Sequence, residues 1–219
     1  MLQRARERGA VVRAGEAAAE LSGAGIKLRD GSFLAAAAVV NATGQWAPAL
    51  TPGIDVRKRK GHLVITDRYP GFVHHQLVEL GYLKSAHSIA ADSVAFNVQP
   101  RKTGQLLIGS SRQFGAEHGE TDTHMLTRML RRAQEYMPGL ASLTAIRSWT
   151  GFRAATSDKL PLIGPCPEDP RLYLATGHEG LGITTSLATG KLVADQLLHR
   201  NPAIPVEPYL PGRKHAAHE

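Results

Sequence analysis

The chain has 219 residues, of which 42% are hydrophobic and 21% charged, a balance that argues against intrinsic disorder and allows one large domain or two small ones. The formal net charge is +7, but charges of both signs are interspersed and aromatic residues make up only 5%, so we expect no nucleic-acid partner. A single cysteine, Cys166, excludes a disulfide within the chain, and no uncharged apolar run reaches the length of about 18 residues that a transmembrane helix requires.

The N-terminal part predicts short elements of an α/β layer. Residues 2–8 have the pattern of the end of a helix, and residues 9–12 the pattern of a turn into a strand. An Asp-Gly pair within residues 25–32 predicts a hairpin, and residues 38–40 predict a buried apolar strand. The small residues after that strand would let a nucleotide's ribose and phosphates lie against the backbone. They are Asn41, Ala42, Thr43 and Gly44.

The middle of the chain, residues 57–149, predicts an antiparallel sheet backed by one helix, an α+β arrangement. Strands are expected over residues 62–66, 93–99 and 105–110, with a hairpin loop between the last two. The helix is expected over residues 122–137 and is ended by a Pro-Gly pair. Its apolar face consists of Met125, Met129, Ala133 and Met137.

A dense basic run precedes the first of these strands. It reads Arg57, Lys58, Arg59 and Lys60. Aromatic residues do not alternate with these cations, as they do in grooves that bind single-stranded nucleic acids. We therefore predict a solvent-facing entry to the strand.

The last third predicts a strand over residues 146–153, whose alternation places Gly151 and Arg153 on one face. Residues 173–198 then predict a short strand, a glycine-rich turn and a long helix. The first amides of such a helix lack internal partners and carry the positive end of the helix dipole, so they suit an anionic ligand. The packed face of the helix is predicted to contain Ile183, Leu187, Gly190, Ala194 and Leu197.

Each of these features also has a simpler interpretation. A glycine-rich turn often makes only a tight connection, and an arginine at a strand end, such as Arg153, is often a surface ion-pair partner. His62 and His178 are candidate polar walls of a site, but ordinary hydrogen-bonded or surface histidines fit the pattern better. Glu179 either lies near a ligand held at the turn or faces solvent, and nothing in the pattern makes it a base.

Other chemistries find no support in the sequence. The histidines lack metal-ligand spacing, and His74 and His75 form a bare pair in a loop, so we expect no metal site. Ser157 and Ser186 lie outside any G-x-S-x-G motif, so a serine hydrolase is not expected. The lone cysteine is typical of a cytoplasmic protein, and peripheral attachment to the inner face of the membrane stays open.

Three stretches, in this order, carry a family resemblance: VVNATGQWA, RSWTGFRAATSDKLPLIGP and LYLATGHEGLGITTSLATGKLVADQLL. The chain resembles the C-terminal part of the D-amino acid oxidase and glycine oxidase superfamily of FAD-dependent oxidoreductases. Within that superfamily, GHLVITD and FNVQPRKTGQLLIGSSR are most similar to subunits of opine, hydroxyproline and glycine dehydrogenases. The resemblance implies FAD as the cofactor and oxidation of an amino acid or secondary amine by hydride transfer to flavin N5.

The resemblance also implies site residues. The counterpart of Arg153 binds the carboxylate of a small amine substrate, which makes Arg153 the catalytic candidate. The residues implied to bind FAD are Val12, Ala42, Thr43, Gly44, Gly151, Gly177, His178, Gly180, Leu181, Gly182, Ile183 and Thr184.

The implied fold class is α/β plus α+β, in which the C-terminal part of a Rossmann-like FAD-binding domain is interleaved with an antiparallel-sheet substrate domain. We expect a partial FAD-binding domain over residues 1–56, a substrate-binding domain over 57–149, and a return to the FAD-binding domain with a C-terminal tail over 150–219. The GxGxxG unit that opens such enzymes is absent from this sequence. We therefore expect a truncated or split enzyme or, alternatively, a non-catalytic polypeptide that binds FAD only with a partner subunit.

Overall fold

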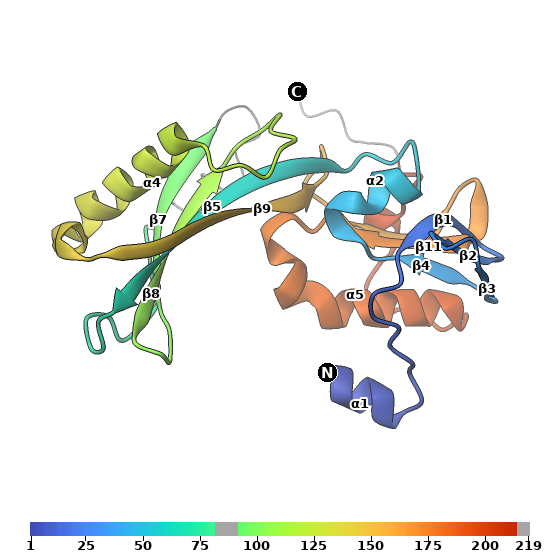
Figure 1. Cartoon of the computed structure of the whole chain (residues 1–219). Helices are drawn as coiled ribbons and strands as arrows, with labels where there is room; N and C mark the ends of the chain where they lie inside the picture. The colour runs from blue at the N-terminus through green and yellow to red at the C-terminus, as the bar shows by residue number, and fades with distance from the viewer. Residues whose placement is uncertain (82–91, 214–219) are drawn as a thin grey trace.

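The computed structural model describes residues 1–81 and 92–213. Figure 1 shows two groups of elements, which we call lobes. The sheet lobe, residues 57–155, contains long antiparallel strands and helix α4. The helix lobe, residues 18–56 and 156–213, contains shorter strands and helix α5. Two long strands, β5 and β9, extend from the sheet lobe toward the helix lobe (Figure 1).

The sheet lobe is built on a five-stranded sheet with the order β6-β7-β8-β5-β9, in which every neighbouring pair is antiparallel. The structure thus confirms the predicted antiparallel sheet, and β9 runs unbroken through the domain boundary predicted between residues 149 and 150. The strands are β5 (Arg57–Arg68), β6 (Leu77–Val78), β7 (Ser93–Pro100), β8 (Gln105–Arg112) and β9 (Ala145–Ala155).

Helix α4 (Thr123–Tyr136) covers one face of this sheet with the apolar face that the sequence predicts. Met125, Met129 and Ala133 are buried, and the last two share a core with apolar residues of β5, β7 and β8. Asp122 caps the helix, because its carboxylate accepts a hydrogen bond from the amide of Met125 at 3.1 Å.

The helix lobe contains a three-stranded mixed sheet drawn from both ends of the chain, in the order β10-β11-β4. Strand β4 (Val39–Asn41) pairs in parallel with β11 (Asp169–Thr176), and β11 pairs antiparallel with β10 (Leu162–Cys166). Helix α5 (Gly182–Leu197) packs against β10 and β11. The predicted strand before residue 41 is therefore confirmed, although its Val40 is 41% exposed and not buried as expected. The predicted strand, turn and helix near the end of the chain are also confirmed.

A second small sheet, β1-β2-β3, contains the predicted hairpin around Asp30 and Gly31. It is tied to β11 because the amide of Gly23 donates to Asp169 Oδ2 at 2.6 Å. The remaining described elements are β1 (Ala18–Ser22), β2 (Gly25–Leu28), β3 (Phe33–Ala35), α1 (Leu2–Glu7), α2 (Ala47–Leu50), η1 (Gly44–Trp46), η2 (Pro138–Ser142), η3 (Glu179–Leu181) and η4 (Glu207–Tyr209).

The prediction that Val12 begins a strand is wrong. Residues 10–13 have no regular structure, and Val11 and Val12 are exposed. In the part of the chain that the structure describes, no strand lies beside these residues to accept their backbone hydrogen bonds, and a strand needs such a partner.

The predicted packed face of α5 is wrong for Ile183 and Leu187, although Leu197 does pack against the core as predicted. Ile183 is 92% exposed and Leu187 is 71% exposed, whereas Leu192 and Val193 are buried. The buried pair shares a core with apolar residues of β10 and β11, including Tyr173, so the helix turns a different side to the sheet. Apolar side chains recur on both sides of this helix, and only the position of the sheet decides which side is covered.

The basic run makes the predicted solvent-facing strand entry at Arg57, but the prediction is wrong for its second half. Arg59 and Lys60 are buried, at 4% and 5% exposure. Arg59 is buried because its guanidinium carbon lies 4.4 Å from the centroid of the Phe114 ring and its Nη1 lies 3.4 Å from Glu179 Oε1. A cation with such partners can leave solvent.

Candidate active site

A cavity of about 420 Å³ lies where the ends of β4, β9 and β11 meet the start of α5. Both lobes contribute to its walls. Strand β9 supplies Arg153, and the turn after β11 supplies Gly177, His178 and Glu179. The three sequence stretches that carry the family resemblance therefore meet at one hollow.

The glycine-rich turn adopts a backbone that larger residues would obstruct. Gly177 has φ +82°, and a Cβ at that position would lie 2.7 Å from Cγ2 of Thr156. Gly182 lines the cavity and begins α5, whose N-terminus has no side-chain cap. The first amides of α5 and the helix dipole thus remain available to an electron-rich group at the cavity.

Arg153 projects from β9 and is held by contacts on several sides. Its Nη1 donates to the carbonyl oxygen of Ser111 at 3.0 Å. The guanidinium lies over Gly61 on the neighbouring strand, where an added Cβ would be 2.6 Å from Nη1. These contacts fix the guanidinium in position. Because the Arg153 side chain is 21% exposed, a ligand can still reach it.

His62 supports this arrangement from within the sheet. The amide of Asp122 donates to its Nε2 at 3.0 Å, and Nδ1 lies 2.8 Å from Ser111 Oγ. Because Nε2 accepts a hydrogen bond, the hydrogen resides on Nδ1 and the ring is neutral. Burial lowers the pKa of His62, and the charge of Lys60 lowers it further. His62 is therefore an ordinary hydrogen-bonded histidine, and it positions the serine whose carbonyl holds Arg153.

His178 joins the turn to β9. Its Nε2 lies 2.8 Å from Thr189 Oγ1, and its backbone forms an isolated bridge with Ala155. Burial lowers the pKa of His178, which favours the neutral ring. His178 thus forms a neutral polar wall of the cavity.

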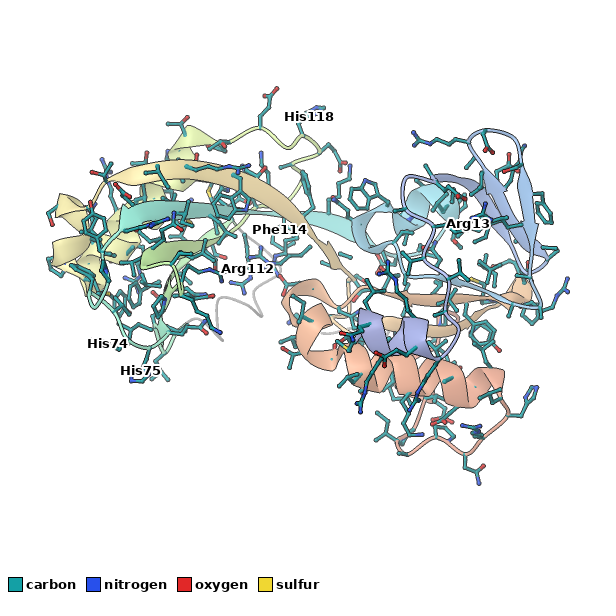
Figure 2. All side chains as sticks on the ribbon, turned by 60° about the horizontal axis from the view of Figure 1, so that its bottom comes forward. Arg13, His74, His75, Arg112, Phe114 and His118 are labelled. Atoms are coloured by element: carbon teal, nitrogen blue, oxygen red, sulfur yellow. The ribbon has the colours of Figure 1, made fainter. Side chains whose placement is uncertain are left out.

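Two further arginines stand next to Arg153. Arg59 and Arg112 are 4% and 3% exposed, and their nearest nitrogens lie 3.4 and 3.5 Å from Glu179 Oε1. Figure 2 shows Arg112 and Phe114 close together between the two lobes. Sequence reasoning missed both arginines. The available signal was that Arg59 would lie directly opposite Arg153 if β5 paired with β9.

The cavity brings together six of the residues implied by the family resemblance: Arg153, Ala42, Gly44, Gly177, His178 and Gly182. The others lie outside its lining. Thr43 sits between the lining residues Ala42 and Gly44, and Gly151 lies opposite Gly61 on β9. The rest are Gly180 and Leu181 in η3, Ile183 and Thr184 on the exposed start of α5, and Val12 in the exposed N-terminal segment.

Several lining residues were not predicted. They flank predicted positions in the sequence, and the motifs alone gave no means of separating them from their neighbours. They are Gln45, Phe152, Ala154, Ala175, Thr176, Glu179, Ser186 and Thr189.

The described residues give no indication of a metal centre: within residues 1–81 and 92–213, histidine, cysteine and acidic side chains do not gather in groups of three or more. Figure 2 shows His74 and His75 together at the far end of the sheet lobe, away from the cavity. No helix in this part of the chain combines the length and apolar character needed to cross a membrane.

Comparison with known proteins identifies the family of the chain. The family model described as "FAD dependent oxidoreductase" (DAO) matches residues 1–196. The chain therefore belongs to this family of FAD-dependent oxidoreductases, and the resemblance inferred from its motifs is confirmed. The cofactor of the family is FAD.

Individual relatives agree with this family assignment. The chain is 31% identical over 183 residues to glycine oxidase of Geobacillus kaustophilus, which covers 82% of this chain and 45% of the relative. It is 27% identical over 195 residues to the hydrogen cyanide synthase subunit HcnC of Pseudomonas aeruginosa, covering 86% and 43%. The crystal structure of glycine oxidase from Geobacillus kaustophilus superposes with a TM-score of 0.80 at 27% identity, covering 97% of this chain and 56% of that one. The chain thus spans about half the length of these relatives.

Proposed function

We propose that this chain takes part in the FAD-dependent oxidation of a small amino acid or secondary amine that carries a carboxylate. One observation carries the proposal: Arg153 and the glycine-rich turn line the same cavity. A guanidinium is a planar donor suited to a carboxylate, and uncapped helix amides suit an electron-rich ring edge. The cavity therefore offers one group for the substrate and another for the cofactor.

The residues present fit the cofactor. Gly44, Gly177 and Gly182 line the cavity without side chains, and an added Cβ at Gly151 would meet no described atom within 4 Å. A flat ring needs such open walls. We propose that the turn and the start of α5 contact the flavin ring of FAD, and that the small residues after β4 contact the rest of the cofactor. The neutral ring of His178 completes this wall.

When bound, FAD would supply the two-electron acceptor for oxidation of the substrate's C–N bond to an imine, which water would then hydrolyse. The protein's contribution is positioning. Arg153 binds the carboxylate and so fixes the C–H bond of the substrate, while the amides at the start of α5 favour negative charge nearby. His62 is buried and bonded at both ring nitrogens, so it does not serve as a base. The reaction requires no side-chain base.

Replacing Arg153 tests the proposal. Arg153→Ala removes a charge-assisted bidentate contact, and we expect the specificity constant for the amine substrate, or the affinity for its carboxylate, to fall by about 2–4 kcal/mol, or roughly 30- to 1,000-fold. Arg153→Lys keeps the charge but lacks the planar pair of donors, so its carboxylate affinity should lie between those of wild type and Arg153→Ala. Isothermal titration with the amino acid and reduction of a dye after FAD loading measure the two quantities.

Arg147→Ala is the matched control, because Arg147 lies on the same strand and is exposed away from the cavity. Equal affinity in Arg153→Ala and wild type would reject the assigned role of Arg153. A dye that stays oxidised with every amino acid, together with carboxylate binding that depends on Arg153, would indicate a carboxylate-binding module instead.

A second function is favoured by the exposed start of α5. Leu181, Ile183 and Leu187 are large apolar side chains that are all more than half exposed. As the alternative, we propose that the chain binds FAD only together with a second polypeptide that supplies the GxGxxG unit and covers these residues. Titrating the purified chain alone with FAD separates the two ideas. A stoichiometric yellow complex would contradict the need for a partner, and its absence until a partner is added would support it.

A further inference from the structure

We infer that Arg59, Arg112 and Arg153 form a carboxylate-binding site that Glu179 of the same chain fills, and that Glu179 thereby restricts the cavity to ligands with one carboxylate. The restriction rests on the proposed function, in which Arg153 binds the substrate. The binding site itself rests on contacts within the described chain.

One oxygen of Glu179 is the centre of the cluster. Its Oε1 lies 3.4 Å from Arg59 Nη1, 3.5 Å from Arg112 Nε and 3.8 Å from Arg153 Nε. The other oxygen, Oε2, accepts a hydrogen bond from the amide of Gly180 at 2.6 Å. Three guanidiniums and a backbone amide are thus arranged around one carboxylate, as they would be around a bound ligand.

The arginines are fixed before any ligand arrives. They come from three adjacent strands, β8, β5 and β9, and Arg59 lies directly opposite Arg153. Phe114 stacks on Arg59, and the carbonyl of Ser111 holds Arg153. Fixed donors lose little conformational entropy when an anion binds.

The electrostatics of the cluster require an anion. Burial lowers the pKa of Arg59 and Glu179 raises it, while Arg112 and Arg153 lower it again. Three positive charges held together in a buried place repel one another unless a negative charge lies among them. Glu179 provides that charge.

The backbone of Glu179 is consistent with an imposed position. Its φ is +50°, a region that non-glycine residues other than Asn and Asp rarely adopt. Such a conformation persists where surrounding contacts determine it. The ion pairs with the arginines are contacts of that kind.

The exposed fractions of these four side chains show which of them a ligand in the cavity can reach. Arg153 and Glu179 line the cavity, with side chains 21% and 20% exposed, whereas Arg59 and Arg112 are almost fully buried. A ligand carboxylate entering from the cavity reaches Arg153, while Glu179 covers the two buried arginines. A second ligand carboxylate would meet the like charge of Glu179, and removal of that side chain takes this repulsion away.

Glu179→Ala tests the inference on the purified chain, without FAD and without turnover. Loss of the internal carboxylate should lower the melting temperature by about 5–10 °C. Acetate at about 100 mM should restore roughly half of this loss, and chloride at equal ionic strength should restore much less. In isothermal titrations, malonate should bind about 10- to 100-fold more tightly to Glu179→Ala than to wild type, because its two carboxylates occupy both sides of the cluster.

Glu117→Ala is the matched control, because Glu117 is an exposed glutamate with one basic partner, Lys58. It should show neither acetate rescue nor a gain in malonate affinity. If Glu179→Ala does not fold, Glu179→Gln keeps the size of the side chain and an acceptor for Gly180, and it should show a smaller gain for malonate. A folded Glu179 variant with unchanged malonate affinity would overturn the inference.

Failure of the proposed function looks different. A gain in malonate affinity in a protein that binds no FAD, either alone or with a partner polypeptide, would leave the carboxylate site standing and reject the oxidoreductase. FAD loading with no gain for malonate would reject the carboxylate site alone.

Discussion

At the scale of single residues, Arg153 can take its position because Gly61, beneath its guanidinium, has no side chain. Gly61 and Gly151 lie directly opposite each other on β5 and β9, yet a Cβ has different consequences at the two places. At Gly61 it would lie 2.6 Å from Nη1 of Arg153, whereas at Gly151 it would meet no described atom within 4 Å. A side chain at position 61 would therefore displace the guanidinium of Arg153, whereas the space beside Gly151 is open.

We expect Gly61→Ala to weaken binding of a monocarboxylate by about 10-fold, because the guanidinium must move away from its carbonyl partner. The free energy of unfolding should change by less than about 1 kcal/mol, since the end of a flexible side chain can yield. Gly151→Ala should keep the carboxylate affinity and lose FAD loading. Isothermal titration and flavin absorbance measure these effects, and the same loss of carboxylate affinity in both variants would count against this assignment.

His62 makes stability depend on pH. Its pKa in the folded chain is lowered by burial and by Lys60, so the unfolded chain binds a proton more readily than the folded one. The contribution of His62 to the free energy of unfolding is therefore fully present above the unfolded pKa of about 6.5 and is lost as the pH falls below it, by at most about 1.4 kcal/mol per pH unit.

His62→Gln should flatten this dependence between about pH 6.5 and 5 while leaving the share that comes from His178, whose pKa is also lowered by burial. Urea denaturation at a series of pH values measures the slope. His124→Gln, at an exposed position on α4, is the control and should keep the wild-type slope. An unchanged slope in His62→Gln would show that the protonation of this ring is not coupled to folding.

At the scale of elements, α4 is held to the sheet by a few fully buried side chains. Met129 is fully buried and belongs to the core with apolar residues of β5, β7 and β8. Met129→Ala should lower the free energy of unfolding by about 2–5 kcal/mol, because it removes apolar contacts and leaves a cavity. Arg131→Ala, on the exposed side of the same helix, should change it by about 0.5 kcal/mol or less. Urea midpoints compare the two, and similar shifts would contradict this packing.

The sequence predicts elements well where one pattern has one explanation. The period of Met125, Met129 and Ala133 indicates a helix with one covered side, and the core confirms it. For α5 the pattern offers apolar residues on two sides, so the covered side depends on a sheet whose place the helix sequence does not contain. The predicted residues that line the cavity were named through the family resemblance, because a glycine-rich turn or a strand-end arginine alone has a simpler interpretation.

The buried arginines illustrate the opposite case. A run of cations reads as a solvated surface, because isolated cations stay in water. What buries Arg59 is the ring of Phe114 and the carboxylate of Glu179, which lie far along the chain. Such pairing exists only after folding has brought the strands and the turn together, and no local pattern reports it.

At the scale of the whole molecule, β5 and β9 connect the two lobes through one long antiparallel pair. We therefore expect the described chain to unfold in a single cooperative transition. Its two tryptophans lie one in each lobe, Trp46 in η1 and Trp149 in β9. Trp149→Phe and Trp46→Phe leave one fluorescent reporter each, and the two urea midpoints should coincide once each is compared with circular dichroism of the same variant. Separate midpoints would show that the lobes unfold independently.

The parallel pairing of β4 with β11 has a consequence for how the protein is made. Val39 lies opposite Leu172, so a strand from the early part of the chain has its partner near the end. During translation, β4 leaves the ribosome long before β11 exists, and pairs so distant along the chain form late and slowly. The nascent polypeptide completes its hollow only after the ribosome has delivered the final helix. Until then, β4 lacks the strand with which it pairs in the folded chain.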